Sequence, residues 1–214
     1  IAHRPLIHRN LSTPQPAAPR TPMSDTTSGR PPAWRIEPPT TLLATPIMKL
    51  VSSRVRREGS HREHDFYRLD FPDWVHVIAV TAAEELVIIR QYRFGSDRVE
   101  LEIPGGAVEE GEDPLTAGLR ELREETGYVA DEARIIGTVR PNPAIQGNTC
   151  HTVLALGAER RNAPQCEEME DIAVVTLPCA EVLRLVASGE LQHGLVLNGL
   201  MYYLMARGLI PLAP

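Results

Sequence analysis

The sequence predicts an α+β fold in which a β-sheet is layered with a few helices, and three observations support this prediction. Short runs rich in valine and isoleucine, which are typical of strands, recur along the chain from about residue 47. Three stretches with helical spacing lie between and after these runs. The 214 residues suit one domain with a tail, and the 43% of hydrophobic residues are enough for a sizeable core. Strands accompanied by a few helices are typical of layered α+β domains.

The strands are predicted from two kinds of pattern. Residues 86–89 read Leu-Val-Ile-Ile, and a wholly apolar run is typical of a strand covered on both faces. Residues 99–103 alternate strictly between apolar and acidic side chains, as in a strand with one buried face. Further runs rich in β-branched residues predict strands within 47–70 and at 75–80, 133–140, 152–156 and 172–177.

Helix start and stop signals bound the helices. Asp113 is a capping carboxylate, Pro114 suits the first helical position, and Gly127 is a typical stop, which together predict a helix of about four turns. Two later helices are predicted at about 180–187 and 194–207, each followed by a glycine. His193 immediately precedes the last helix, and we interpret it as a cap or packing residue.

The front of the chain has a different composition. Residues 1–46 hold ten of the nineteen prolines, together with many serines, threonines and arginines. Such a segment buries too little apolar surface to offset the entropy of ordering it. We therefore predict a disordered tail over residues 1–46 and a folded domain over residues 47–210. Met23 is the first methionine, and one hypothesis is that native translation starts there, with residues 1–22 as an upstream extension.

Charge and cysteine content limit the functional classes. The net charge of −6 argues against general nucleic-acid binding, which favours a basic face. No stretch approaches the roughly 20 apolar residues that a membrane span needs, so we expect neither a nucleic acid nor a membrane as partner. The cysteines at 150, 166 and 179 form no Cys-x-x-Cys pair, which favours reduced thiols and a cytoplasmic location.

One face of the helix predicted after Asp113 concentrates negative charge. At about 100° per residue, the leucines at 115, 119 and 122 form an apolar stripe, and three glutamates lie on a different face, Glu121, Glu124 and Glu125. Like charges at this spacing repel one another. A hard divalent cation such as Mg²⁺ removes that cost, because it prefers oxygen ligands. The alternative interpretation is a solvated acidic face.

The residues around the helix favour the metal site. Residues 103–106 read Ile-Pro-Gly-Gly and end a strand with two glycines, so the backbone can approach a ligand closely. Glu112 lies at the entrance of the helix. Arg120 lies within it and can orient carboxylates through a bidentate pair.

Together these residues resemble the signature of the Nudix hydrolases. Gly106, five residues, Glu112, seven residues and then Arg-Glu-Leu-Arg-Glu-Glu-Thr-Gly-Tyr at 120–128 fill every fixed position of the Nudix box. The resemblance covers about residues 47–207. It implies an α/β/α sandwich with a mixed β-sheet and a loop–helix–loop that holds Mg²⁺, for which Mn²⁺ can substitute.

The resemblance also implies roles for individual residues. The metal ligands are one backbone carbonyl and three carboxylates, those of Gly106, Glu121, Glu124 and Glu125. Glu112 is the structural partner of Arg120. We place Glu121, Glu125 and Arg120 in the catalytic group as well.

Two segments before the box resemble the ADP-ribose and nucleotide-sugar pyrophosphatase branch. These are Gln-Tyr-Arg at 91–93 and Leu-Glu-Ile-Pro-Gly-Gly at 101–106. The resemblance implies that Arg93 faces the substrate phosphates and that Glu102 lies in the site. Trp74 is a candidate for stacking on a base, with a core or interface position as the alternative. After the box, the branch usually has Ser-Pro-Gly where this chain reads Pro-Asn-Pro-Ala-Ile-Gln-Gly-Asn at 141–148, a departure that bears on substrate identity.

An acidic loop near the end resembles the loop that supplies the catalytic base in ADP-ribose pyrophosphatases. Residues 167–172 read Glu-Glu-Met-Glu-Asp-Ile. By position, Glu168 matches the base and Glu170 a further metal ligand, while an ordinary acidic loop is the alternative. A nearby metal ion lowers the pKa of water, so a carboxylate suffices as base at neutral pH.

The resemblance implies Mg²⁺-dependent hydrolysis of the pyrophosphate bond of ADP-ribose or a nucleotide sugar, giving a nucleoside monophosphate and a sugar phosphate. Two alternatives stay open. One is a hydrolase of dinucleoside polyphosphates or other nucleotides, and the other is a non-catalytic Nudix-like ligand sensor, which typically has eroded glutamates. Relatives in this branch are commonly homodimers whose N-terminal strands help build the partner's site, so we expect a homodimer.

Overall fold

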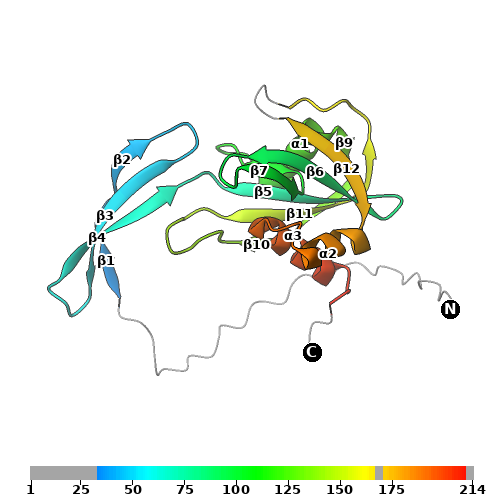
Figure 1. The fold of residues 1–214 in the computed structure, drawn as a ribbon. Helices are drawn as coiled ribbons and strands as arrows, with labels where there is room; N and C mark the ends of the chain where they lie inside the picture. The colour runs from blue at the N-terminus through cyan, green and yellow to red at the C-terminus, as the bar shows by residue number, and fades with distance from the viewer. Residues whose placement is uncertain (1–32, 167–170, 211–214) are drawn as a thin grey trace.

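The computed structural model describes residues 33–166 and 171–210, and in these residues two β-sheets lie side by side (Figure 1). The smaller sheet comes first in the chain and projects from one end of the molecule. The larger sheet carries the helices and the sequence signature. None of the helices in the described residues is both long and apolar enough to cross a bilayer.

The smaller sheet is organised around its longest strand. Its four strands are β1 (Trp34–Ile36), β2 (Thr40–Ala44), β3 (Lys49–Arg57) and β4 (Glu63–Asp70). β3 pairs antiparallel with each of the other three. The prediction of strands within residues 47–70 is confirmed by β3 and β4.

The prediction of a disordered tail reaching residue 46 is wrong for residues 33–46. β1 and β2 lie in this segment and are held by backbone hydrogen bonding to β3. Pro38 and Pro39 fall in the connection between the two strands, where the missing N–H groups break no ladder. The composition argument failed because the stabilising partner lies elsewhere in the chain. Residues 1–32 are outside the described residues, so a disordered tail there stays a prediction.

The larger sheet is mixed, as expected. Its strands are β5 (Trp74–Thr81), β6 (Glu85–Arg93), β7 (Arg98–Glu102), β8 (Gly105–Ala107), β9 (Tyr128–Val129), β10 (Glu132–Val139), β11 (Cys150–Arg160) and β12 (Ile172–Pro178). The main order is β10-β11-β5-β6-β12. β11 and β5 run parallel, whereas the other pairs of this sheet are antiparallel.

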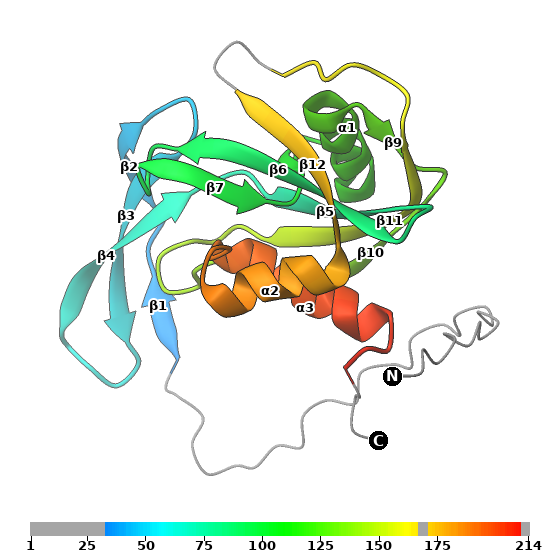
Figure 2. The same cartoon turned by 45° about the vertical axis from the view of Figure 1, so that its right-hand side comes forward.

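Helices cover both faces of the larger sheet. α1 (Pro114–Thr126) lies on one face, and α2 (Cys179–Ser188) and α3 (Gly194–Ala206) lie on the other (Figure 2). Each face has its own apolar core. Within β6, Val87 packs on the α1 side and Ile88 on the α2–α3 side, so the run at 86–89 is covered on both faces, as predicted. The α/β/α sandwich is confirmed.

Local signals account for the bounds of α1. The Asp113 carboxylate accepts hydrogen bonds from the amides of Leu115 and Thr116, each at 3.1 Å, so it caps the helix start. Gly127 ends the helix with a φ of 72°, a left-handed conformation that glycine adopts without strain. Ala117 and Leu122 are fully buried against the sheet. This packing fixes the direction in which the glutamates of α1 point.

Candidate active site

Arg120 is the centre of a carboxylate cluster on α1. Its guanidinium donates to both oxygens of Glu112, with Nε–Oε1 at 3.0 Å and Nη2–Oε2 at 2.9 Å. Nη1 also donates to Glu121 at 2.8 Å and to Glu124 at 3.2 Å. The hydrogen bonds from Arg120 lower the pKa of Glu112, and those to Glu112 raise the pKa of Arg120. Arg120 therefore favours the ionised form of Glu112 and holds three carboxylates in fixed positions.

The two glycines after β7 bring backbone against the end of α1. A Cβ on Gly106 would lie 2.4 Å from Oε1 of Glu121, so a side chain at this position would displace the Glu121 carboxylate. The amide of Gly105 donates to Oε2 of Glu125 at 2.8 Å. Glu125 is only 3% exposed, which is rare for a carboxylate that lacks polar partners. The segment 103–106, here called the glycine-rich turn, and the glutamates of α1 form one compact polar unit.

A cavity of about 250 Å³ opens beside this unit. It brings together five of the residues predicted for the site, Trp74, Arg93, Glu102, Gly106 and Glu125. These residues come from β5, β6, β7, β8 and α1. Glu121 and Glu124 do not line the cavity, although Glu121 lies directly behind Gly106.

Arg93 and Glu102 form a bidentate ion pair in this cavity. Nε of Arg93 lies 2.6 Å from Oε1 of Glu102, and Nη2 lies 2.8 Å from Oε2. The Glu102 side chain is 2% exposed, whereas that of Arg93 is 41% exposed. Arg93 thus donates a hydrogen bond to each carboxylate oxygen of Glu102. The geometry makes Glu102 the residue that orients Arg93.

The sequence model of the NUDIX domain family matches residues 71–194 of this chain. The chain belongs to the Nudix family. The match includes the glycine-rich turn, α1 and every residue that lines the cavity except Leu195.

Two curated relatives and a solved structure are similar to this chain. The chain is 30% identical to a methanol dehydrogenase activator of Bacillus methanolicus over 61% of its own length and 71% of the relative. It is 32% identical to an ADP-ribose pyrophosphatase of Bacillus subtilis, with the same coverage of 61% and 71%. A crystal structure of an ADP compounds hydrolase has the same fold, with a TM-score of 0.74 and 20% identity over 86% of this chain and 100% of that one.

The donors at the end of α1 fit the hard divalent cation that the Nudix box implies. They are carboxylate oxygens with a backbone carbonyl close by, the set that Mg²⁺ prefers. Because Gly106 has no Cβ, its backbone can lie close to an ion held by Glu121. Within residues 33–166 and 171–210, no three His, Cys, Asp or Glu side chains converge on one point. Arg120 binds Glu121 and Glu124 in this arrangement.

Two predicted site residues lie outside the described residues. These are Glu168, expected as the base, and Glu170, expected as a further metal ligand. Gln165 precedes this segment, and its amide donates to the carbonyl of Glu124 at 2.7 Å. The chain therefore enters the acidic loop from the end of α1 that bears the glutamates.

Trp74 occupies the first position of β5, where it lines the cavity and also packs against Phe71. The two rings are 5.3 Å apart between centroids in an edge-to-face arrangement. Packing and exposure to the cavity therefore coexist at this residue.

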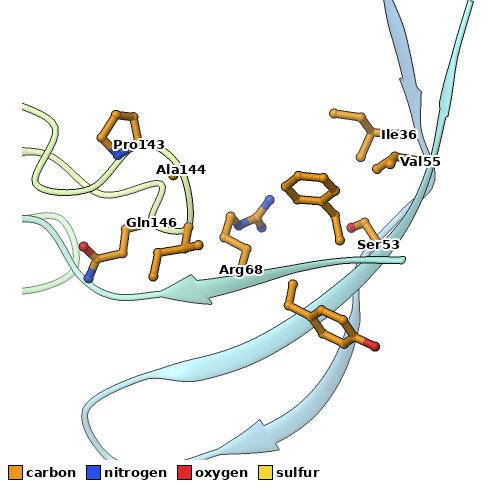
Figure 3. A pocket seen from close by; sticks show the side chains of 10 residues that line it. Ile36, Ser53, Val55, Arg68, Pro143, Ala144 and Gln146 are labelled. Carbon is orange, nitrogen blue, oxygen red and sulfur yellow. The ribbon is translucent and has the colours of Figure 1, made fainter. Parts of the chain in front are cut away.

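The segment that departs from the branch pattern contacts the smaller sheet. Pro143, Ala144 and Gln146 line a separate cavity of about 220 Å³ together with Arg68 of β4 (Figure 3). The amide of Leu69, also in β4, donates to the carbonyl of Ile145 at 2.8 Å. This segment is absent from the lining of the cavity that holds Arg93.

Three polar residues for which the sequence predicted no role in the site also line the Arg93 cavity, namely His76, Gln91 and His193. Burial, the largest cause, lowers the pKa of His76 to about 4, so this imidazole is neutral at physiological pH. Gln91 lies two residues before Arg93 on β6, and the period of two in strands could have indicated that they share a face.

His193 caps α3, as expected, and also reaches the cavity. Its Nδ1 accepts a hydrogen bond from the amide of Val196 at 3.4 Å. Its Nε2 lies 4.0 Å from Oε2 of Glu102. The preceding residue, Gln192, accepts a hydrogen bond from Arg98 of β7 at 2.9 Å, which ties this turn to the sheet. No local sequence signal indicates this second position of His193.

Proposed function

We propose that this Nudix protein hydrolyses the diphosphate linkage of ADP-ribose or a nucleotide sugar, giving a nucleoside monophosphate and a sugar phosphate. The observation that carries the proposal is the single cavity that joins Arg93, held by buried Glu102, to Gly106 and Glu125. A guanidinium facing a carboxylate-rich helix suits a substrate with two adjacent phosphates. The identity to an ADP-ribose pyrophosphatase over 61% of this chain supports the same substrate class.

Each residue of the site has a role in this proposal. Arg93 binds a phosphate of the substrate, and Glu102 keeps the guanidinium in place. Arg120 positions Glu121 and Glu124 from behind and takes no part in the proton transfer. Glu168 takes the proton of the attacking water, whose oxygen bonds to phosphorus as the bridging P–O bond breaks.

Divalent ions complete the proposed site. Glu121, Glu124 and Glu125, the carbonyl of Gly106 and the carboxylate of Glu170 would hold Mg²⁺, or Mn²⁺ in its place. When bound, the ion stabilises the developing phosphate charge and lowers the pKa of the attacking water. The buried position of Glu125 beside the Gly105 amide keeps this carboxylate fixed between turnovers.

A substrate screen tests the proposed activity. The release of phosphorylated products is measured with ADP-ribose, ADP-glucose, GDP-mannose, diadenosine polyphosphates and NADH, each with and without Mg²⁺. We expect AMP and ribose 5-phosphate from ADP-ribose, formed only in the presence of the metal ion. Preferred cleavage of diadenosine polyphosphates would show that these compounds are the substrates instead of ADP-ribose or a nucleotide sugar. No turnover of any compound would favour a ligand sensor.

We also propose a homodimer that uses the smaller sheet, in a cytoplasmic protein with reduced cysteines. The smaller sheet exposes large apolar side chains, including Trp34 at 50%, Ile36 at 67% and Phe66 at 56%. A gathering of such side chains on one projecting element is typical of a protein interface. Cys150, Cys166 and Cys179 form no disulfide, which supports the reduced state.

A further inference from the structure

We propose that Gln91 and His193, here called the polar wall, bind hydroxyl groups of the sugar attached to the diphosphate. This inference rests on the proposed function and assigns the sugar, as opposed to the base, to the part of the cavity beside Glu102. Neither residue belongs to the Nudix box, and they lie on different elements, β6 and the turn before α3. Both line the cavity that contains Arg93.

Gln91 offers a buried acceptor to the cavity. Its side chain belongs to a residue that is only 7% exposed, and Oε1 has no hydrogen-bond donor within the described residues. Buried carboxamides normally have partners, and exceptions need an explanation such as a missing ligand or water. A ligand group that donates a hydrogen bond would satisfy Oε1. The position of Gln91 two residues from Arg93 places that donor near the phosphate site.

His193 offers a donor to the same cavity. Because Nδ1 accepts the amide hydrogen of Val196, the proton of the neutral ring lies on Nε2. Among the described residues, the carboxylate oxygen that pairs with Nε2 is Oε2 of Glu102, which lies 4.0 Å away and is beyond hydrogen-bond range. That oxygen is already bound by Arg93. The Nε2–H group is therefore placed to donate to an oxygen of a ligand.

A hydroxyl group matches the polar wall better than a phosphate does. Phosphate oxygens only accept hydrogen bonds, so they cannot satisfy the carbonyl of Gln91. A hydroxyl donates and accepts at once, so it can donate to Gln91 and accept from His193. A sugar carries several hydroxyl groups that can contact the lining of a cavity of about 250 Å³.

The base is better placed at Trp74. Among the described residues that line the cavity, Trp74 alone supplies an indole or phenyl ring for stacking. It lies at the start of β5 and pairs with Ala107, next to the glycine-rich turn. We therefore assign the base to Trp74 and the sugar to the polar wall.

The test compares two substrates that differ only in the sugar. ADP-ribose and the β-methyl ester of ADP share adenosine and the diphosphate, but the ester lacks the sugar hydroxyls. Gln91→Met keeps the side-chain length and removes the amide, and His193→Ser keeps a capping oxygen for α3 and removes the imidazole. Gln146→Met, in the segment facing the smaller sheet, is the matched control.

We expect each polar-wall variant to lower kcat/KM for ADP-ribose about ten-fold, mainly through KM, because one hydrogen bond to the substrate is lost. The same variants should change kcat/KM for the methyl ester less than about two-fold. Gln146→Met should leave both values unchanged. If His193→Ser fails to fold by circular dichroism, Gln91→Met decides the test.

Other outcomes separate the two proposals. Equal losses on both substrates, or no loss on either, would overturn the inference while the proposed function stands. A loss that changes with the base, between ADP-ribose and GDP-ribose, would assign the polar wall to the base and also overturn it. A wild-type protein that hydrolyses neither substrate would overturn the proposed function and this inference together.

Discussion

At the residue scale, the acidic side chains of α1 have different surroundings although they lie on one helix face. Glu121 and Glu124 share the guanidinium of Arg120, whereas Glu125 is buried and bound to the Gly105 amide. Glu125 therefore has the most constrained carboxylate of the three. Removing the negative charge of Glu125 therefore changes the site and has little effect on the protein surface.

Replacing Glu125 by glutamine should separate chemistry from folding. Glu125→Gln keeps an oxygen that can accept from the Gly105 amide, but it loses the negative charge proposed to bind the metal ion. We expect kcat to fall at least about 100-fold, because metal binding needs the carboxylate. Thermal unfolding should change by only a few degrees. Near-normal turnover of ADP-ribose would contradict the role given to Glu125.

A side chain at Gly106 should displace the Glu121 carboxylate. In Gly106→Ala the new Cβ would lie 2.4 Å from Oε1 of Glu121, so the carboxylate or the turn must move. We expect weaker Mg²⁺ activation, seen as a higher Mg²⁺ concentration at half-maximal rate, by about ten-fold. Gly95→Ala is the control, because a Cβ there meets nothing within 4 Å. Identical Mg²⁺ titrations for both variants would show that the close approach has no function.

His76 should make stability fall below neutral pH. Its folded pKa of about 4, lowered mainly by burial, lies below the ordinary value of 6.5. The unfolded chain therefore binds the proton first, and stability is lost as the pH falls from about 6.5 toward 4, by up to about 3 kcal/mol. Denaturant unfolding at pH 7 and pH 5 measures the loss. His76→Gln should show a smaller difference between the two pH values, and an unchanged difference would refute this origin.

At the element scale, α1 was predictable because its signals are local. The cap at Asp113, the proline after it and the stop at Gly127 all act within one helical turn of the ends. The strands at 86–89 and 99–103 were predictable for a similar reason, since their patterns report burial directly. β1 and β2 were missed because their hydrogen-bonding partner, β3, follows them in the chain.

The cap of α1 should contribute measurably to stability. Asp113→Ala removes two hydrogen bonds to the amides of Leu115 and Thr116. We expect a loss of about 1 kcal/mol in the free energy of unfolding, measured by denaturant titration. Asp131→Ala, at a side chain that is 86% exposed, should cost less than about 0.5 kcal/mol. Equal effects of the two variants would rule out capping as the cause.

At the scale of the whole molecule, the smaller sheet and the Nudix domain are joined through the segment after β10. The 143–146 segment contacts β4, and Leu69 of β4 pairs with Gln146 in an isolated bridge. The exposed apolar side chains of the smaller sheet lie away from the large core. This arrangement leaves the sheet available for association.

The proposed homodimer can be tested on the smaller sheet. Leu42 is 53% exposed on β2, so Leu42→Asp should perturb an interface with little effect on the core. We expect the wild-type protein to sediment as a dimer and the variant to shift toward the monomer at micromolar concentration. Leu183→Asp, at a residue 37% exposed on α2, is the control and should stay dimeric. A monomeric wild-type protein would contradict the proposal.

By itself, the sequence determined the family, the helix with its carboxylates and the pairing of Glu112 with Arg120. The family and the pairing follow from the resemblance to the Nudix box. The helix follows from spacing and caps that are local in the chain. The sequence also indicated Arg93 and Glu102, through segments next to the Nudix box. It could not indicate that Glu102 is buried beneath Arg93, because burial depends on the layers above and below the sheet.

Only the tertiary structure decided which other residues share the cavity. His76 and His193 are 117 positions apart, and their rings approach to 6.0 Å between centroids only when α3 packs on the sheet. Gln91 joins them through the pairing of β6 with its neighbours. Side chains from distant segments meet because the sheet order and the helix layers place them together, and no local pattern encodes that arrangement.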